Sequence, residues 1–134
     1  MMVSPVYGGG GMDTVSYVLA IEEISKVDAS CGVIMSVNNS LVCWGLEKFG
    51  SHKQKEKYLR RLSTGEIIGA FCLSEPEAGS DATSQQTTAI DMGNHYLLNG
   101  TKNWITNGNS ASVYLVIAQT DVSLGYTGIN AFIV

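Results

Sequence analysis

The loop Leu73–Asp81 is the first segment whose residue types could do chemistry. It runs Leu-Ser-Glu-Pro-Glu-Ala-Gly-Ser-Asp and follows an apolar stretch with the pattern of a strand. Two hydroxyl groups, a rigid proline and a permissive glycine can turn backbone N–H groups toward an anion such as a pyrophosphate. A solvated turn has the same composition. From these residues alone both interpretations stay open, and the solvated turn is the more common one.

The segment Lys102–Thr106 places an aromatic side chain near a hydroxyl. Strand-like alternation there puts Lys102, Trp104 and Thr106 on one face. A flat indole beside a hydroxyl suits a ring with a π face and hydrogen-bonding edge atoms, as an isoalloxazine has. The alternative is that Trp104 only covers the core, which is the commoner role of a strand tryptophan.

Other chemical groups carry less information. Glu75 and Glu77 flank a proline and could form an acid and base pair, but solvation or an ion pair is the simpler role for loop carboxylates. The glycines of Gly8–Gly11 lack the preceding strand that a nucleotide-binding motif requires, which indicates a flexible turn. The cysteines and histidines have no metal-ligand spacing, so no metal site is expected. They are Cys31, Cys43, Cys72, His52 and His95.

Composition limits the kinds of partner. The 134 residues carry a net charge of −4, only 15% are charged, and the mean hydropathy is +0.12. Nucleic acid is therefore not expected as a partner, and some faces are expected to be covered by partner subunits or further chain. Neither a secretory signal nor a membrane span of roughly 20 apolar residues is expected. The basic cluster within 53–61 indicates a solvated helix face, or else a docking surface for an acidic partner.

The first half of the sequence has helical patterns. A helix is predicted from a cap at Asp13 to about Val27. A second, buried on most sides, is predicted over Ser30–Phe49. A third is predicted between a cap at Ser51 and a stop at Gly65.

After Gly65 the pattern becomes strand-like, with Asn99-Gly100 predicting a tight hairpin and Asp91–Asn94 a looser turn. Sequential short strands favour an antiparallel sheet. Helices followed by such strands predict an α+β fold with domains 1–65 and 66–134. The chain ends within an apolar strand, from which we expect that it is part of a longer protein. The predicted strands are Ile67–Leu73, Thr87–Ile90, His95–Leu98, Lys102–Ile105, Tyr114–Ala118 and Ile129–Val134.

Four segments in this order resemble the acyl-CoA dehydrogenase family. The resemblance covers essentially the whole chain, and its last two segments are the most specific. Ser36–Leu41 is most similar to the short-chain (butyryl-CoA) members. The four segments are Val3–Gly9, Ala20–Ser25, Phe71–Asp81 and Leu98–Asn107.

The resemblance implies a helical N-terminal domain, a middle β-barrel domain and a C-terminal four-helix domain, with FAD between the last two. The chain would then cover part of the first domain and part of an incomplete, antiparallel β-barrel-like middle domain. Ser80 would also bind the CoA part of the substrate, and the Thr106 hydroxyl would lie near the reactive edge of the flavin. The residues implied to contact FAD are Phe71, Leu73, Ser74, Gly79, Ser80, Trp104, Ile105 and Thr106.

The implied reaction, a property of the full-length parent, is flavin-dependent α,β-dehydrogenation of short-chain acyl-CoA to trans-2-enoyl-CoA in fatty acid β-oxidation. A glutamate removes the α proton while a hydride passes to the flavin, and electrons continue to an electron-transferring flavoprotein. That glutamate is expected in the C-terminal domain, so no catalytic residue is assigned here. The resemblance further implies a homotetramer in a bacterial cytoplasm or a mitochondrial matrix. The alternatives are a catalytically incompetent fragment, an interaction module, or an acyl-CoA oxidase.

Overall fold

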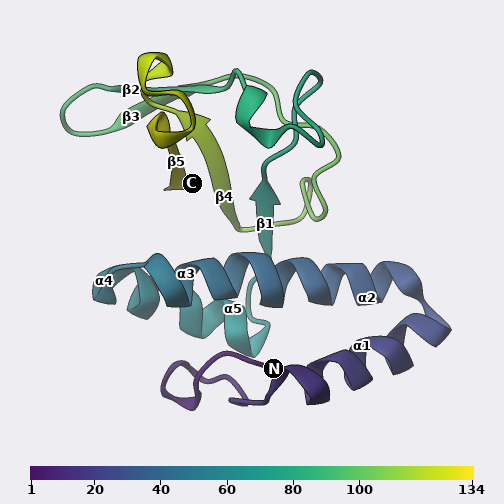
Figure 1. Cartoon of the computed structure of the whole chain (residues 1–134). Helices are drawn as coiled ribbons and strands as arrows, with labels where there is room; N and C mark the ends of the chain where they lie inside the picture. Colours follow the sequence, from purple (N-terminus) through teal and green to yellow (C-terminus); the bar gives the residue numbers. More distant parts are fainter. The chain divides into compact units, whose positions relative to one another are not determined.

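The computed structural model describes residues 1–134 and divides into two compact units. The helical unit comprises Met1–Phe71 and Thr106–Val113, and the β unit comprises Cys72–Ile105 and Tyr114–Val134. Helices therefore come first and strands follow, as Figure 1 shows by its sequence colours. The predicted α+β fold class is confirmed, while the boundary between residues 65 and 66 stays a prediction.

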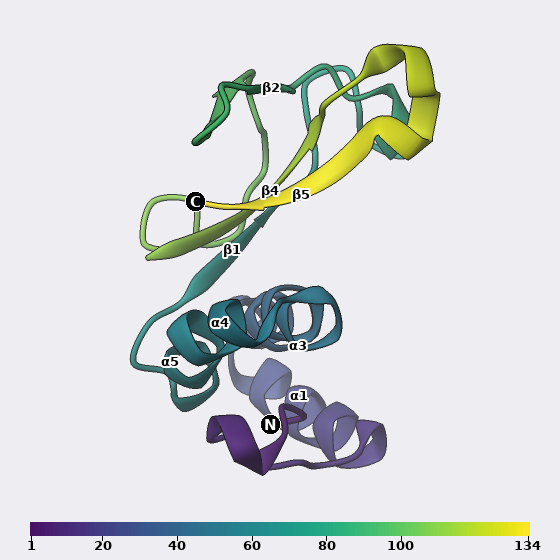
Figure 2. The same ribbon diagram turned by 90° about the vertical axis from the view of Figure 1, so that its left-hand side faces the viewer.

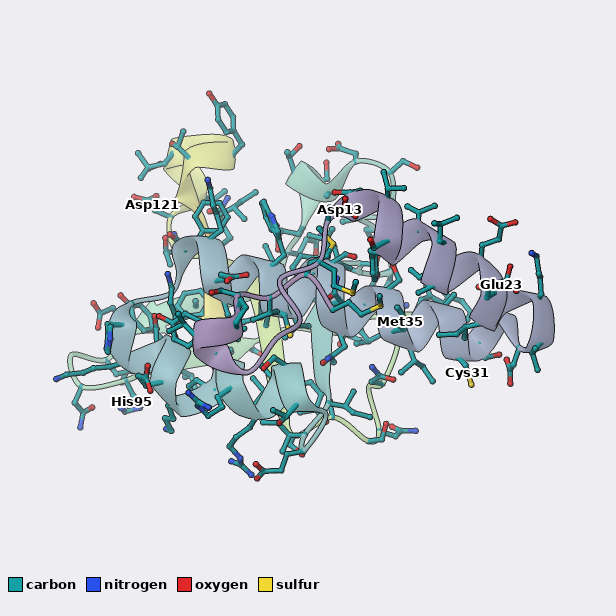
Figure 3. All side chains as sticks on the ribbon, turned by 90° about the horizontal axis from the view of Figure 1, so that it is seen from below. Asp13, Glu23, Cys31, Met35, His95 and Asp121 are labelled. Atoms are coloured by element: carbon teal, nitrogen blue, oxygen red, sulfur yellow. The ribbon has the colours of Figure 1, made fainter.

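Helix α1 (Thr14–Val27) begins where the sequence predicts. The Asp13 carboxylate accepts a hydrogen bond from the Ser16 N–H at 2.8 Å, which satisfies one of the free donors of the first turn. Asp28 ends α1, and its carboxylate in turn caps the next helix by accepting from the Ser30 N–H at 2.7 Å. Figure 3 labels Asp13 at the start of the helix.

The predicted helix Ser30–Phe49 is present as one continuous rod. It consists of α2 (Ala29–Ser36), a π-helical segment η2 (Val37–Cys43) and α3 (Trp44–Phe49). The prediction that this helix is buried on most sides was wrong, because the rod packs along one stripe that includes Val42, Cys43 and Leu46. Five large apolar residues are 38% to 76% exposed: Val33, Ile34, Leu41, Trp44 and Phe49.

This rod, Ala29–Phe49, is 21 residues long with a mean hydropathy of 1.2, which is long and apolar enough to cross a membrane. No segment of this kind is expected from the sequence. Core helices of soluble proteins reach the same length and hydropathy, so the rod is weak evidence for a membrane span.

The third predicted helix is also confirmed, as α4 (His52–Gln54), a π-helical segment η3 (Lys55–Leu59) and α5 (Arg60–Thr64). Ser51 and Gln54 form a capping box at its start. Gly65 ends it in the left-handed conformation, with φ of 79°. Leu59 and Leu62 are fully buried and form its inward stripe.

The β unit is built from two antiparallel pairs. Strand β2 (Thr88–Asp91) pairs with β3 (Tyr96–Asn99), and β4 (Val113–Gln119) pairs with β5 (Ile129–Ile133), with Ile117 opposite Ala131. Figure 2 shows β4 and β5 side by side. A single parallel bridge, Thr88 to Gln119, joins the two pairs. The sheet is not closed into a barrel.

The short elements complete the chain. Strand β1 (Gly69–Cys72) follows the third helix. The 3-10 segments are η1 (Pro5–Tyr7), η4 (Ala82–Ser84) and η5 (Val122–Gly128). The looser turn predicted over Asp91–Asn94 is confirmed, because it joins β2 to β3 with the Met92 N–H donating to His95 O at 2.9 Å.

Two predictions in the following segment were wrong. Lys102–Ile105 is an irregular loop instead of a strand, and Asn99-Gly100 makes no hairpin. Trp104 has φ of 60°, in the left-handed region, which ends any extended run. Asn99 lacks the positive φ that the predicted turn needs at its first central position.

Candidate functional site

The loop Leu73–Asp81 is a tight turn followed by an exposed tip. Glu75 and Ala78 exchange two backbone hydrogen bonds of 3.0 and 3.2 Å, which fixes the turn around Pro76. Gly79 and Ser80 lie beyond it and are exposed. The Asp81 carboxylate then accepts from the N–H of Thr83 and begins η4. The loop therefore has a rigid base and an open tip.

A buried ion pair holds the base of this loop. Lys102 Nζ lies 2.7 Å from Glu75 Oε1, and the two side chains are only 10% and 4% exposed. Lys102 Nζ also donates to Leu73 O at 3.0 Å and to Gln85 Oε1 at 3.2 Å. Of the two simpler roles considered for Glu75, the structure shows the ion pair.

The Glu75 carboxylate is held in its ionised form. Burial raises its pKa, but hydrogen bonds from Lys102, Thr87 and Gln86 lower it more, from the ordinary 4.5 to about 2. Near neutral pH the group is therefore a fixed anion. A carboxylate with a lowered pKa, held by these bonds, fits a structural role better than that of a general acid or base, whose pKa lies near the working pH.

The two candidate segments lie side by side within the β unit. The Asn103 N–H donates to Ser74 O at 2.8 Å, next to the bond from Lys102 to Leu73 O. Two consecutive residues of one segment thus bind two consecutive residues of the other. Glu75 and Lys102 are 27 residues apart in sequence, so no local pattern could have predicted this contact.

Trp104 follows directly after this anchored stretch. Its side chain is 95% exposed, so the alternative that it covers the core was wrong. Its left-handed backbone turns the chain out of the extended direction, directly after Asn103, which is bonded to the neighbouring loop. An exposed indole on a fixed backbone is an open face for a flat ring, and in this respect the segment fits a flavin.

Phe71 and Thr106 belong to the helical unit, where both are half-buried. Phe71 lies in β1, and Thr106 begins a turn that leads to Asn107. The predicted common face of Trp104 and Thr106 depended on a strand that does not form. The roles of all eight residues implied to contact FAD stay predictions.

The other chemically active side chains form no cluster. No group of three or more His, Cys, Asp or Glu residues could hold a metal ion. Burial raises the pKa of Cys43 to about 12 and raises that of Cys72 as well, so both thiols stay protonated near neutral pH. Cys31 is exposed, and its side chain points away from the helix (Figure 3).

Sequence reasoning missed several residues that shape the site. Gln85 and Asn103 hold the two candidate segments, yet neither belongs to a motif that predicts such a role. For Lys102, the sequence indicates only a place on the expected strand. An alternating pattern cannot reveal that its ammonium group is buried against a carboxylate.

Comparison with known families covers nearly the whole chain. The model described as "Acyl-CoA dehydrogenase, N-terminal domain" matches residues 1–66, and "Acyl-CoA dehydrogenase, middle domain" matches residues 70–134. The human mitochondrial short-chain specific acyl-CoA dehydrogenase is 50% identical over 134 residues, which are 100% of this chain and 32% of that protein. The chain thus spans about a third of the length of such curated relatives.

Solved structures agree with this match. A structure reported for the electron transferring flavoprotein of Acidaminococcus fermentans has a TM-score of 0.97 and 49% identity, covering 100% of this chain and 35% of that one. Butyryl-CoA dehydrogenase from Megasphaera elsdenii has a TM-score of 0.94 and 45% identity, covering 99% and 36%. A glutaryl-CoA dehydrogenase from Mycobacterium smegmatis, solved with FADH2, has a TM-score of 0.92 and 42% identity, covering 100% and 33%. On this sequence and structural evidence the chain belongs to the acyl-CoA dehydrogenase family.

Proposed function

We propose that this chain takes part in FAD-dependent α,β-dehydrogenation of short-chain acyl-CoA thioesters. The observation that carries the proposal is the exposed indole of Trp104, which follows a segment anchored by a buried ion pair. Family membership and the likeness to short-chain and butyryl-CoA dehydrogenases support the reaction and the chain length. When bound, FAD would accept the hydride from the β carbon of the acyl group.

The proposed role of this chain's own residues is to bind and orient the flavin and the substrate. Trp104 offers a flat face to the isoalloxazine, and Ser80, on the exposed loop tip, is proposed to reach the CoA part of the substrate. Glu75 and Lys102 hold these segments without touching the reacting atoms. No residue of this chain is assigned as the catalytic base. The proposed flavin contacts are Phe71, Leu73, Ser74, Gly79, Ser80, Trp104, Ile105 and Thr106.

The proposal extends to partners and setting. We propose an electron-transferring flavoprotein as electron acceptor, a homotetrameric assembly, and a bacterial cytoplasm or mitochondrial matrix as the compartment. The likeness to a structure reported for an electron transferring flavoprotein supports the acceptor, and mitochondrial and bacterial relatives support the two compartments. The domains proposed are 1–65 and 66–134.

The test is anaerobic mixing of the full-length parent of this chain, purified with FAD, with butyryl-CoA. The visible absorbance of the flavin should bleach as the substrate is oxidised. If butyryl-CoA and every longer or branched acyl-CoA left the absorbance unchanged, the proposal would be wrong. Rapid reoxidation of the bleached flavin by oxygen would identify an acyl-CoA oxidase instead.

A second candidate function is a binding module without turnover. It is favoured by the exposed apolar side chains of α1, where Val15, Val18 and Leu19 are 54% to 67% exposed. A purified chain that bound neither FAD nor acyl-CoA in equilibrium dialysis would support this candidate, and a chain that showed the visible absorbance of bound flavin and turned over acyl-CoA would exclude it.

A further inference from the structure

The first residue of β1, Gly69, is held by two asparagine side chains from distant parts of the helical unit. The Gly69 N–H donates to Asn38 Oδ1 at 2.9 Å, and Gly69 O accepts from Asn107 Nδ2 at 3.1 Å. Asn38 lies in η2 of the long rod, and Asn107 lies in the turn after Thr106. We call Asn38, Gly69 and Asn107 the asparagine clamp.

Asn38 also closes the connection from the third helix to β1. Its Nδ2 donates to Leu62 O at 3.2 Å while its Oδ1 accepts from Gly69. One side chain therefore joins the last turn of α5 to the start of the strand. Such a bidentate contact fixes where the strand begins relative to the rod.

Asn107 has a backbone suited to its role. Its φ is 66°, a left-handed conformation that Asn tolerates better than most residues. Its own carbonyl accepts from the N–H groups of Ser110 and Ala111 at 3.0 and 2.8 Å. A further bond, from the Ser112 N–H to Ile68 O at 2.9 Å, ties the same turn to the residue before Gly69.

Glycine is required at the centre of the clamp for a spatial reason. A Cβ on residue 69 would lie 2.5 Å from Val42 Cγ1, and Val42 is completely buried in the rod. The backbone of β1 therefore contacts the rod directly. Both polar groups of Gly69 then need partners beside that contact, and the two asparagine amides supply them.

We infer that Asn38 and Asn107 are positioning residues that set the places of Phe71 and Thr106 for flavin binding. Phe71 is two residues beyond Gly69 on β1, and Thr106 is covalently joined to Asn107. This inference rests on the proposed function, which assigns Phe71 and Thr106 to the flavin. The clamp itself consists of neutral amides, so its hold does not depend on the charge state of any group.

Amide hydrogen exchange, followed by NMR on the 134-residue chain, tests the clamp without flavin. N38A should speed exchange of the Gly69 amide about tenfold, the equivalent of one lost hydrogen bond. N107G keeps the left-handed backbone but removes the amide, and it should shift the Thr106 and Phe71 signals while leaving those of α1 unchanged. Unchanged Gly69 exchange in N38A, or unchanged Thr106 and Phe71 signals in N107G, would overturn the inference.

FAD titration of the same variants separates this inference from the proposed function. N107G should bind FAD about tenfold more weakly than the wild-type chain, and N107A is its matched variant with a side chain but no amide. Equal FAD affinity in the wild type and N107G would overturn the positioning role. Failure of the wild-type chain to bind FAD would count against the proposed function, whereas the exchange experiment would still decide whether the clamp positions Phe71 and Thr106.

Discussion

Two ion pairs in this molecule have the same nitrogen–oxygen distance and different surroundings. Lys102 and Glu75 in the β unit lie 2.7 Å apart and are 10% and 4% exposed. Arg61 and Glu66 in the helical unit also lie 2.7 Å apart but are 50% and 60% exposed. Distance alone would rank them equal. Burial makes the first an anchor of the candidate site and leaves the second a surface contact.

The asparagine clamp in the helical unit performs the corresponding task with neutral groups, because the amides of Asn38 and Asn107 join distant segments at Gly69. Elsewhere this unit also uses charged groups, such as Glu47, which accepts from the Ser4 N–H at 3.0 Å. The β unit joins its two candidate segments through a charged pair. We therefore expect this pair to be more sensitive than the clamp to acid and to the loss of one partner.

Breaking the buried pair from one side should give the largest effect. K102M leaves the Glu75 carboxylate buried without its cation, which should cost about 3–5 kcal/mol of unfolding free energy. Urea unfolding followed by circular dichroism measures this. The double variant E75Q/K102M, which has no buried charge, should recover most of the loss. A single variant as stable as the wild type would show that the pair is not an anchor.

Acid should weaken the same pair. The pKa of Glu75 is about 2 in the folded chain against an ordinary 4.5, so its contribution is full above pH 4.5 and is lost as the pH falls toward 2. The difference corresponds to about 3 kcal/mol. The unfolding free energy of the wild type should fall as the pH is lowered across this range, and that of E75Q should not show this fall. Parallel pH profiles of the two proteins would contradict the assignment.

Crowding the clamp should have an intermediate effect that does not depend on pH. G69A places a Cβ 2.5 Å from Val42 Cγ1, and overpacking of this kind costs about 1–3 kcal/mol. G79A is the matched control, because a Cβ there would meet no atom within 4 Å. Thermal unfolding should separate the two variants clearly. Equal melting temperatures would mean that β1 and the rod can move apart without cost.

The exposed pair should give the smallest effect. R61A removes the bond to Glu66 Oε1, and exposed ion pairs contribute about 0.2–1 kcal/mol, less at high salt. The melting temperatures of R61A and the wild type should therefore converge as salt is added. A loss of stability in R61A as large as that in K102M would contradict the distinction between the buried and the exposed pair.

The helices could be predicted from the sequence because their signals are local. Asp13, Ser51 and Gly65 each sit within a few residues of the groups that they cap. The loop before Trp104 could not, because its conformation is set by bonds from Lys102 and Asn103 to residues about 29 positions away. Alternation predicted a strand there, but the structure has long-range hydrogen bonds at Lys102 and Asn103 and a left-handed residue at Trp104.

The candidate site was likewise predictable only in part. The ordered segments pointed to the family, which the comparisons then supported through residues 1–66 and 70–134. The groups that hold the segments together, such as Gln85 and Asn38, belong to no motif. Their roles depend on which backbone groups the fold leaves without partners.

One titration tests the central claim most directly, because the chain has a matched pair of tryptophans. FAD should change its visible spectrum on binding to the wild-type chain and to W44A, whose Trp44 packs against Phe49 on α3. W104A should bind about tenfold more weakly, since it lacks the exposed indole. If W104A bound FAD with the affinity and spectrum of the wild type, Trp104 would not be part of a flavin site.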